Sequence, residues 1–172
     1  MRGLITSAVL MSVLAVPASA QRYYARERLH VVPDAPAEPP ADPKGRVANG
    51  GFEDGAVAPW ASAGTAPTLV QTNVRSGAYS LRFGAPGTTV SQTVATDARN
   101  YTLSFSCYAT AGYSVRVRWN GVSVSTCGTG GNSAWTSGSV VVRGTGGDDV
   151  LSFVAPATAT GRMIDDVSLS AS

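Results

Sequence analysis

The sequence predicts an all-β domain, a two-sheet β-sandwich with jelly-roll topology, preceded by a signal peptide and a proline-rich tether. Two observations predict the sandwich. Short segments alternate apolar and polar residues, and clusters of Gly, Pro, Asn and Asp separate them. Alternation of this kind buries one face of each strand and leaves the other in solvent. No stretch keeps a helical period over a useful length. We expect the domain at residues 46–172, a length that suffices for one core.

The chain begins with the three parts of a signal peptide. Met1-Arg2 gives a positive start, Leu4–Val16 is apolar, and Pro17–Ala20 supplies the small residues of a cleavage site. The apolar run is shorter than the about 20 residues that a membrane span needs. We expect residues 1–20 to be removed and the mature protein to be secreted or extracellular, or periplasmic in a Gram-negative host. An uncleaved anchor is the alternative.

Residues 21–45 are expected to form a disordered linker. Five prolines lie within Pro33–Pro43, together with acidic residues. Proline at this density excludes a helix and favours a semi-rigid, polyproline-like spacer. The spacer either holds the domain away from a wall or a second protein, or is a leader without a partner.

Eight segments of the domain have the composition and alternation of strands. In chain order they are Tyr79–Phe83, Thr89–Val94, Tyr101–Cys107, Ser114–Trp119, Val122–Ser125, Ser139–Arg143, Val150–Val154 and Met163–Leu169. Between the fourth and the fifth lies Asn120-Gly121, a strong hairpin signal. Parity predicts a core that includes Tyr101, Leu103, Phe105, Cys107, Val115, Val117 and Trp119. Trp60 and Trp135 are expected at corners of the sandwich, where they either pack or form a ligand platform at the loop rim.

The polar faces of the third and fourth segments carry residues suited to a sugar. Tyr108, Arg116 and Arg118 project away from the core, on one side of neighbouring strands, and Tyr113 lies in the turn at their end. Aromatic rings stack on sugar faces, and Arg donates hydrogen bonds to hydroxyls. We take these four residues as candidate carbohydrate-binding residues. An ordinary polar sheet exterior is the alternative.

Two cysteines in an exported chain predict one disulfide, Cys107–Cys127. In a simple meander these residues lie on strands that flank Ser114–Trp119, roughly 10 Å apart, whereas a disulfide needs about 4.4–6.8 Å between Cα atoms. A bridge therefore requires the chain to change sheets near Ala109–Gly112. Two free thiols are the alternative.

Charge and composition exclude several function classes. The chain has a formal net charge of +2, and from Arg46 onward eight Arg stand against seven Asp and Glu. A nucleic-acid footprint needs clustered Lys and Arg, so we expect no nucleic-acid partner. The domain has no Lys and no His, and a base that titrates near neutral pH is therefore missing. No nucleophile elbow, metal-type Cys/His spacing or phosphate loop is present. We expect neither an enzyme nor a membrane span.

Asn100-Tyr101-Thr102 is an N-glycosylation sequon. Asn100 is modified only if the host is eukaryotic. The sequence does not identify the host.

Acidic residues open and close the domain. Glu53 follows Asn49-Gly50-Gly51-Phe52, and Asp165 and Asp166 lie in the last strand segment. A small antiparallel sandwich brings its chain ends together, so these carboxylates can share one hard cation. Loop capping without a metal is the alternative.

Six short motifs follow one another along the domain. They are Val47–Gly55, Pro59-Trp60, Ser76–Leu81, Val90–Val94, Tyr101–Phe105 and Ile164–Leu169. In this order they resemble a family 4/9-type (cellulase-C-like) carbohydrate-binding module, over nearly the whole domain. The resemblance implies a galactose-binding-like jelly roll, a structural calcium, and non-catalytic binding of β-glucans, xylans or related polysaccharides.

The resemblance also implies a calcium ligand set by position. It consists of the Glu53 carboxylate, a carboxylate of the closing strand, and backbone oxygens near Gly51 and Ser76. Asp165 is the first choice over Asp166. Calcium takes six to eight oxygens, carboxylates and carbonyls among them, so this set is chemically reasonable. The resemblance implies no particular sugar-contacting residue.

We therefore expect a secreted, monomeric, non-catalytic module that binds a β-linked polysaccharide or cell-wall glycan, with Ca²⁺ as structural cofactor. A structural or adhesion protein of the cell envelope or wall, with the same fold and no glycan binding, is the alternative. A glycosidase that uses Glu53 with Asp165 or Asp166 is a third interpretation. It is disfavoured because metal ligands make poor general acids.

Overall fold

The computed structural model describes residues 46–109, 114–128, 133–157 and 161–172, and these residues form a β-sandwich. Its strands are β1 (Ala61–Ala63), β2 (Thr68–Val70), β3 (Ser80–Arg82), β4 (Thr89–Ala95), β5 (Asn100–Ala109), β6 (Val115–Trp119), β7 (Val122–Cys127), β8 (Ala134–Arg143), β9 (Asp148–Val154) and β10 (Met163–Ala171). The predicted signal peptide and linker, residues 1–45, lie outside the described residues. Nothing helical in the described part has the length and hydropathy for crossing a membrane.

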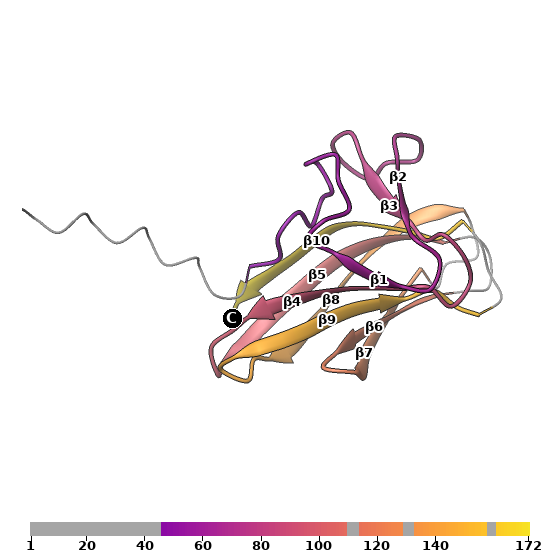
Figure 1. Cartoon of the computed structure of the whole chain (residues 1–172). Coiled ribbons are helices and arrows are strands. Elements are labelled where there is room, and N and C mark those ends of the chain that lie inside the picture. Colours follow the sequence, from indigo (N-terminus) through magenta and orange to yellow (C-terminus); the bar gives the residue numbers. More distant parts are fainter. Residues whose placement is uncertain (1–45, 110–113, 129–132, 158–160) are drawn as a thin grey trace, which may run out of the picture. The chain divides into compact units, whose positions relative to one another are not determined.

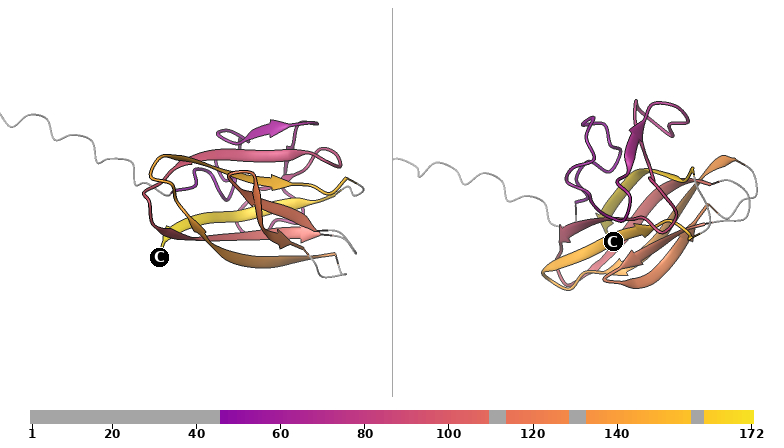
Figure 2. Two further views of the ribbon diagram at one scale, coloured as in Figure 1. Left: turned by 90° about the horizontal axis from the view of Figure 1, so that it is seen from below. Right: turned by 45° about the vertical axis from the view of Figure 1, so that its right-hand side comes forward.

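Two antiparallel sheets of five strands each make the two layers (Figures 1 and 2). Sheet I has the order β1-β4-β9-β6-β7, and sheet II has the order β2-β3-β10-β5-β8. Consecutive strands β4 and β5 lie in different sheets, as do β5 and β6, β7 and β8, β8 and β9, and β9 and β10. Repeated crossing between layers is the jelly-roll pattern. The predicted all-β sandwich is confirmed.

All eight predicted strand segments are strands, and two further strands were not predicted. β1 and β2 have only three residues each, and their burial does not alternate. β8 begins earlier than expected, at Ala134, so that Trp135 lies inside a strand and not ahead of one. The hairpin at Asn120-Gly121 joins β6 to β7 as predicted, and both residues have positive φ. That conformation explains the Asn-Gly pair.

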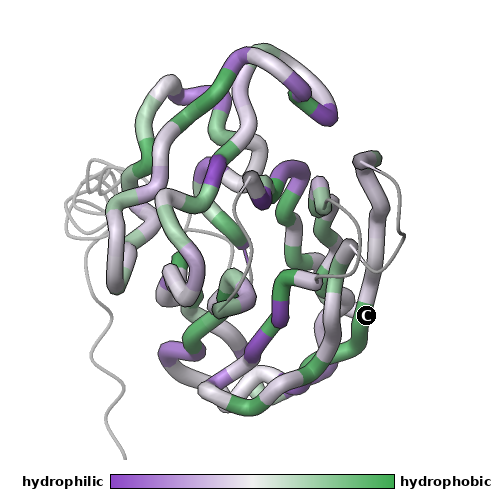
Figure 3. The backbone as a smooth tube through the Cα atoms, turned by 90° about the vertical axis from the view of Figure 1, so that its right-hand side faces the viewer, coloured by the Kyte–Doolittle hydropathy of each residue, from purple (hydrophilic) through white to green (hydrophobic). Residues whose placement is uncertain are grey.

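The apolar faces of the two sheets meet in one core. Along β5 the side chains of Tyr101, Leu103, Phe105 and Cys107 are buried, and polar residues alternate with them. Figure 3, coloured by hydropathy, shows hydrophobic and hydrophilic residues following one another along the backbone. The ring of Phe153 on β9 packs against Phe105 on β5, with 5.9 Å between the ring centroids, and so joins the two layers. Parity along β5 and β6 therefore predicted the core correctly.

Tryptophan packing follows the prediction at two positions. Trp119 is buried, and its indole N–H donates to the carbonyl of Arg143 at 3.0 Å. Trp60 is buried against the rings of Phe52 and Phe153. These two indoles fill the interior and leave no ring face for a ligand.

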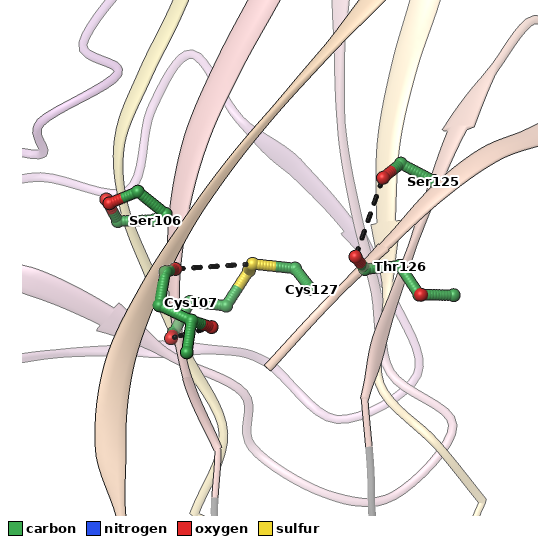
Figure 4. The surroundings of a disulfide bond; sticks show 7 residues. Ser106, Cys107, Ser125, Thr126 and Cys127 are labelled. Carbon is green, nitrogen blue, oxygen red and sulfur yellow. Dashed lines mark hydrogen bonds between the residues drawn. A yellow bond between two sulfur atoms is a disulfide. The ribbon is translucent and has the colours of Figure 1, made fainter. Parts of the chain in front are cut away.

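The disulfide Cys107–Cys127 crosses the core from β5 in sheet II to β7 in sheet I (Figure 4). The Cα atoms are 5.7 Å apart, a distance typical of bridged residues. Two strands on either side of β6 in one sheet would be too far apart for this bond. The prediction of a bridge and of a change of sheet between β5 and β6 is therefore confirmed. No described cysteine is free.

Candidate functional site

A groove of about 480 Å³ opens on the outer face of sheet II. Its lining consists of Arg75, Ser104, Phe105, Ser106, Ser137, Gly138, Ser139 and Asp166. The volume lies in the range of small-ligand sites. Six of the eight lining residues have polar side chains, and the lining joins residues from β5, β8, β10 and the loop between β2 and β3.

Serine side chains from two neighbouring strands form the floor of this groove. Register places Ser106 opposite Ser137 and Ser104 opposite Ser139. Because residues at this spacing share a sheet face, all four hydroxyls point outward. The hydroxyls of Ser106 and Ser137 lie 2.9 Å apart and share a hydrogen bond. Small side chains leave the hollow open, and their hydroxyls can both donate and accept hydrogen bonds.

An aromatic pair stands at one end of the serine floor. Tyr108 and Trp135 are direct cross-strand partners on β5 and β8, and their ring centroids are 5.8 Å apart in an edge-to-face arrangement. Both side chains are half-buried, so part of each ring remains in solvent. The indole N–H of Trp135 donates to the carbonyl of Asn73 at 3.0 Å. That bond fixes the indole against the β2–β3 loop.

The β2–β3 loop, residues 71–79, reaches over the outer face of sheet II. It follows β2, at one edge of the sheet, and contacts Trp135, a residue of β8 at the opposite edge. The segment between β2 and β3 stands above β10 in Figure 1. Ser106, although on the outer face of β5, is only 3 % exposed. The loop and β8 therefore bound the groove on its two sides.

Two carboxylates from opposite ends of the domain hold this loop. Asp165 on β10 accepts hydrogen bonds from the backbone N–H groups of Arg75 and Ser76. Glu53 accepts hydrogen bonds from the backbone N–H groups of Ala78 and Tyr79, at 2.9 to 3.1 Å. Carboxylates that accept backbone N–H bonds are strong loop anchors. The opening and closing acids thus meet at one loop, as expected for the two chain ends.

Asp165 is the one anchor that is fully buried. Burial raises the pKa of its carboxyl to about 6, helped by the neighbouring charge of Asp166, whereas the backbone N–H groups of Asp166, Ser76 and Arg75 act in the opposite direction. Asp166 lies beside it with a positive φ of 51° and accepts a hydrogen bond from the Ser76 hydroxyl. The side chains of Asp165 and Asp166 therefore point in different directions. One lies beneath the loop and the other faces the groove.

The structure corrects one prediction about the candidate sugar residues. Tyr108 is on β5 of sheet II, whereas Arg116 and Arg118 are on β6 of sheet I. All three point away from the core as predicted, but they lie on opposite outer faces of the sandwich. The prediction that they form one surface is wrong, because the chain changes sheets between β5 and β6. Tyr113 lies outside the described residues.

The predicted calcium ligands are near one another without forming a dense cluster. The described residues contain no group of three acidic, Cys or His side chains suited to a metal. Glu53 and Asp165 bind the same loop, and the backbone N–H of Val167 donates to the carbonyl of Gly50, next to Gly51. Oε2 of Glu53 and Oδ1 of Asp165 each accept one hydrogen bond and keep one lone pair, whereas Oε1 of Glu53 and Oδ2 of Asp165 each already accept two. A cation there would need backbone oxygens as its remaining ligands.

A larger hollow, about 760 Å³, lies beside β1 and β4. Its lining includes Arg46, Asn49, Gln92 and Asp148, and no described aromatic ring. Gln92 is already bonded to the backbone N–H and C=O of Ala48, and the Asn49 amide donates to two backbone carbonyls. These side chains are used to fold the opening segment. The smaller groove on sheet II is therefore the better candidate site.

Sequence reasoning found Tyr108 and missed the rest of the groove. Trp135 was expected at a corner of the sandwich, Asp166 was expected as a metal ligand and not as a sugar contact, and Arg75 was not predicted to have a role. The signal was present in β8, where Trp135, Ser137 and Ser139 alternate on one face. Their pairing with Tyr108, Ser106 and Ser104 depends on the register of β5 and β8. A sequence without known strand order does not contain that register.

Asn100 is exposed at the start of β5, opposite Arg143 on β8. Its side chain is therefore accessible to a glycan. Modification of Asn100 stays a prediction.

No known family model matches the chain, and no curated protein matches it. Solved structures are similar to it in fold. One is TmCBM61 in complex with β-1,4-galactotriose, with a TM-score of 0.59 and 22% identity over 75% of this chain and 99% of that chain. Another is the xylan-binding domain of CBM 22, with a TM-score of 0.57 and 20% identity over 77% of this chain and 97% of that chain. A family 35 carbohydrate-binding module from Clostridium thermocellum has a TM-score of 0.52 and 20% identity, covering 66% of this chain and 92% of that chain. At these identities the similarity shows a shared β-sandwich fold.

Proposed function

We propose that this chain is a secreted, non-catalytic carbohydrate-binding module that binds a β-linked polysaccharide in the groove on sheet II. The observation that carries the proposal is a groove with a floor of serine hydroxyls, next to which the aromatic pair Tyr108 and Trp135 lies on the same two strands. An aromatic ring covers the apolar face of a sugar, and hydroxyls with Arg75 and Asp166 bond to its polar edge. Such contacts suit a neutral glycan.

The structures that share the fold support this class of ligand. One of them holds β-1,4-galactotriose, and another is described as xylan-binding. Their sequences are too distant to carry over any residue. The finer resemblance to family 4/9-type modules, the particular glycan, the monomeric state and secretion belong to the proposal and rest on the sequence.

Hydrogen bonding supports a non-catalytic role. A glycosidase needs two carboxyl groups that face each other across the scissile bond. Here Glu53 and Asp165 both bond to backbone N–H groups of the β2–β3 loop. Carboxylates that anchor a loop are not available as acid and base. These two groups are assigned to shaping the groove.

A structural calcium is part of the proposal. Glu53 and Asp165 would supply its carboxylates, and backbone oxygens near Gly51 and Ser76 the remainder, as the resemblance implies. The cation would stabilise the loop that bounds the groove. It would have no role in sugar chemistry.

Retention on insoluble polysaccharides tests the proposed function. The mature protein is incubated with xylan, β-1,4-galactan, β-glucan and chitin, and bound protein and released reducing ends are measured. We expect retention on at least one β-linked polysaccharide and no hydrolysis. Ser137→Val with Ser139→Val should lose retention by filling the floor, whereas Ser170→Val, on the same face outside the groove, should keep it. Absence of retention on every polysaccharide would favour the structural or adhesion alternative.

A further inference from the structure

The outer face of sheet I carries two arginines that the groove on sheet II does not use. Arg116 and Arg118 are two residues apart on β6, a separation of about 6.8 Å along a strand. Their neighbours across β7 and β9 are Thr126 and Val154 for Arg116, and Ser123 and Ser152 for Arg118. All four neighbours are short and uncharged. The two arginine side chains therefore leave the same face of β6 among short, neutral neighbours.

Neither arginine has an anionic partner in the described residues. No salt bridge or hydrogen bond joins the Arg116 or Arg118 side chain to a described group. The Nε–H of Arg118 is shielded from solvent and has no acceptor among the described atoms. A shielded donor without an acceptor is unfavourable, and more so when it belongs to a charged group. An oxygen from outside the described chain would relieve this cost.

Charged groups on the strands around β6 do not compensate the pair. On β4 the outward residues are Thr89, Ser91, Thr93 and Ala95, and on β7 they include Ser123 and Thr126. Two acids lie on β9. Asp149 is buried, and its carboxylate already accepts hydrogen bonds from Thr96, Asn120 and Thr145. Asp148 is exposed but lies four residues from Ser152, about 13 Å along the strand. The internal segments outside the described residues, 110–113, 129–132 and 158–160, contain no acidic residue. The local charge is therefore positive on a domain that is nearly neutral.

A small hollow adjoins this pair. It has a volume of about 280 Å³ and is lined by Gly87, Ser114, Arg116, Thr126, Val154, Ala155, Pro156 and Ala157. Two hydroxyls and a guanidinium face one space, and Pro156 and Val154 supply an apolar wall. A hollow of this size and mixed lining fits one sugar ring better than an extended chain. If a sugar ring occupies the hollow, Arg118 would lie near a group attached to that ring.

We propose that Arg116 and Arg118 form a second site, on the opposite outer face from the groove, that binds the anionic groups of an acidic polysaccharide. Arg presents its N–H donors in a planar fork that matches carboxylate and sulfate oxygens. Both anions share that chemistry, so a uronic acid and a sulfate ester are the two sources. The site is independent of the groove on sheet II. With both sites, one molecule can hold two glycan chains on opposite faces.

Affinity measurements with defined polymers test this site. The mature protein is titrated with a polyuronate, with dextran sulfate, with uncharged dextran and with a single-stranded DNA oligonucleotide. We expect binding to the polyuronate, to dextran sulfate or to both, and none to dextran. Arg116→Gln and Arg118→Gln should each weaken binding about tenfold, since a charge-assisted hydrogen bond is lost, and the double variant should not bind. Salt of about 1 M, which shortens the Debye length to about 3 Å, should abolish binding.

Matched variants separate this site from the groove and from general charge. Arg82→Gln removes the same charge from an exposed strand position on sheet II and should bind as the parent does. Tyr108→Ala should bind the anionic polymer with the same affinity as the parent, whether or not a neutral glycan binds in the groove. Equal binding by parent and double variant, equal binding of DNA, or no binding of either acidic polymer would overturn the proposal. Unchanged melting temperatures of all variants verify that each is folded.

Discussion

At the scale of single residues, the candidate groove depends on one cross-strand aromatic pair, Tyr108 on β5 and Trp135 on β8. Alternation in Tyr101–Cys107 predicted which side chains are buried, and it placed Tyr108 outside the core. It did not show that Trp135 lies opposite Tyr108, because that pairing joins residues far apart in sequence. The candidate site was therefore half predictable. The sequence of β5 was sufficient to identify Tyr108, whereas Trp135 on β8 could be identified as its partner only once the fold was known.

Asp165 gives a prediction about pH in calcium-free buffer. Burial raises the pKa of its carboxyl to about 6 in the folded protein, against about 3.9 in an unfolded chain. The folded state thus binds the proton more tightly, and the free energy of unfolding falls as pH rises from about 4 to about 6. The full difference is about 2–3 kcal/mol. Above this range Asp165 contributes no further change.

Urea unfolding at several pH values measures this dependence, and Asp165→Asn should flatten it. Asp149, also buried, has a shift of the opposite sign. Burial tends to raise its pKa, but hydrogen bonds from Asn120, Thr96 and Thr145 together lower it. Its contribution is lost as pH falls from about 5, the opposite trend to that of Asp165, so the comparison with Asp165→Asn isolates the Asp165 effect where the two ranges overlap. A parent protein that is as stable at pH 6 as at pH 4.5 would refute the account of Asp165.

At the scale of elements, long alternating strands were predicted and short irregular ones were not. β1 and β2 are three residues long, and all of β1 is exposed, so no periodic signal marks them. The change of sheet between β5 and β6 was predictable only through the disulfide. The two acids at the ends of the domain were predicted to meet. Their shared partner, the β2–β3 loop, was not, because loop paths follow tertiary contacts.

Gly77 tests how tightly the β2–β3 loop is packed on Glu53. Gly77 has a φ of +63°, and an added Cβ would lie 2.4 Å from the Glu53 carboxyl group. Gly87 has a similar φ of +78° but nothing within 4 Å of the Cβ position. Both Ala variants incur the cost of a left-handed residue, about 1–2 kcal/mol. Gly77→Ala should lose about 1–3 kcal/mol more than Gly87→Ala, because either the loop must move or the Glu53 carboxylate must give up its hydrogen bonds to Ala78 and Tyr79.

Thermal unfolding of the two glycine variants gives the comparison. Equal losses at the two positions would mean that the loop moves freely and that Glu53 does not fix it.

The disulfide is predicted to contribute substantially to stability. It joins residues separated by 20 positions and spans the two sheets. Loop-closure entropy of that length corresponds to about 3 kcal/mol. Cys107→Ala with Cys127→Ala should lower the free energy of unfolding by about that amount in urea titrations. Reductant should destabilise the parent and leave the double variant unchanged. A reductant-insensitive parent would contradict this contribution.

At the scale of the whole molecule, the two outer faces of the sandwich differ in chemistry. Sheet II presents a serine floor with an aromatic pair, and sheet I presents two arginines without an anionic partner in the described residues. Composition and alternation were sufficient for the fold class. Alternation along a strand predicts whether a side chain points into the core or toward solvent, but it does not predict the sheet to which the strand belongs. It could therefore not show that Tyr108 lies on the opposite face from Arg116 and Arg118. Topology decides which polar residues can share a ligand.

Removal of divalent ions tests the proposed calcium. If Glu53 and Asp165 hold a cation, chelator should lower the melting temperature of the parent by several degrees, since a ligand that binds only the folded state stabilises it. Re-addition of Ca²⁺ should restore it, and Glu53→Gln should remove most of the effect. Asp54→Asn, an exposed neighbour, is the matched control. A melting temperature that does not respond to chelator would leave the two carboxylates as loop anchors alone.

The most direct test of glycan binding in the groove is a titration monitored by tryptophan fluorescence. Trp60 and Trp119 are buried, whereas Trp135 is half-exposed beside the groove, so a ligand there should change the emission of Trp135. We predict an emission change with oligosaccharides of the retained β-linked polysaccharide. Trp135→Phe should lose that change, and Tyr108→Ala should bind about threefold to tenfold more weakly. Val141→Ala, an exposed change on the same face outside the groove, should match the parent. Emission that still changes in Trp135→Phe, with full affinity in Tyr108→Ala, would contradict binding in this groove.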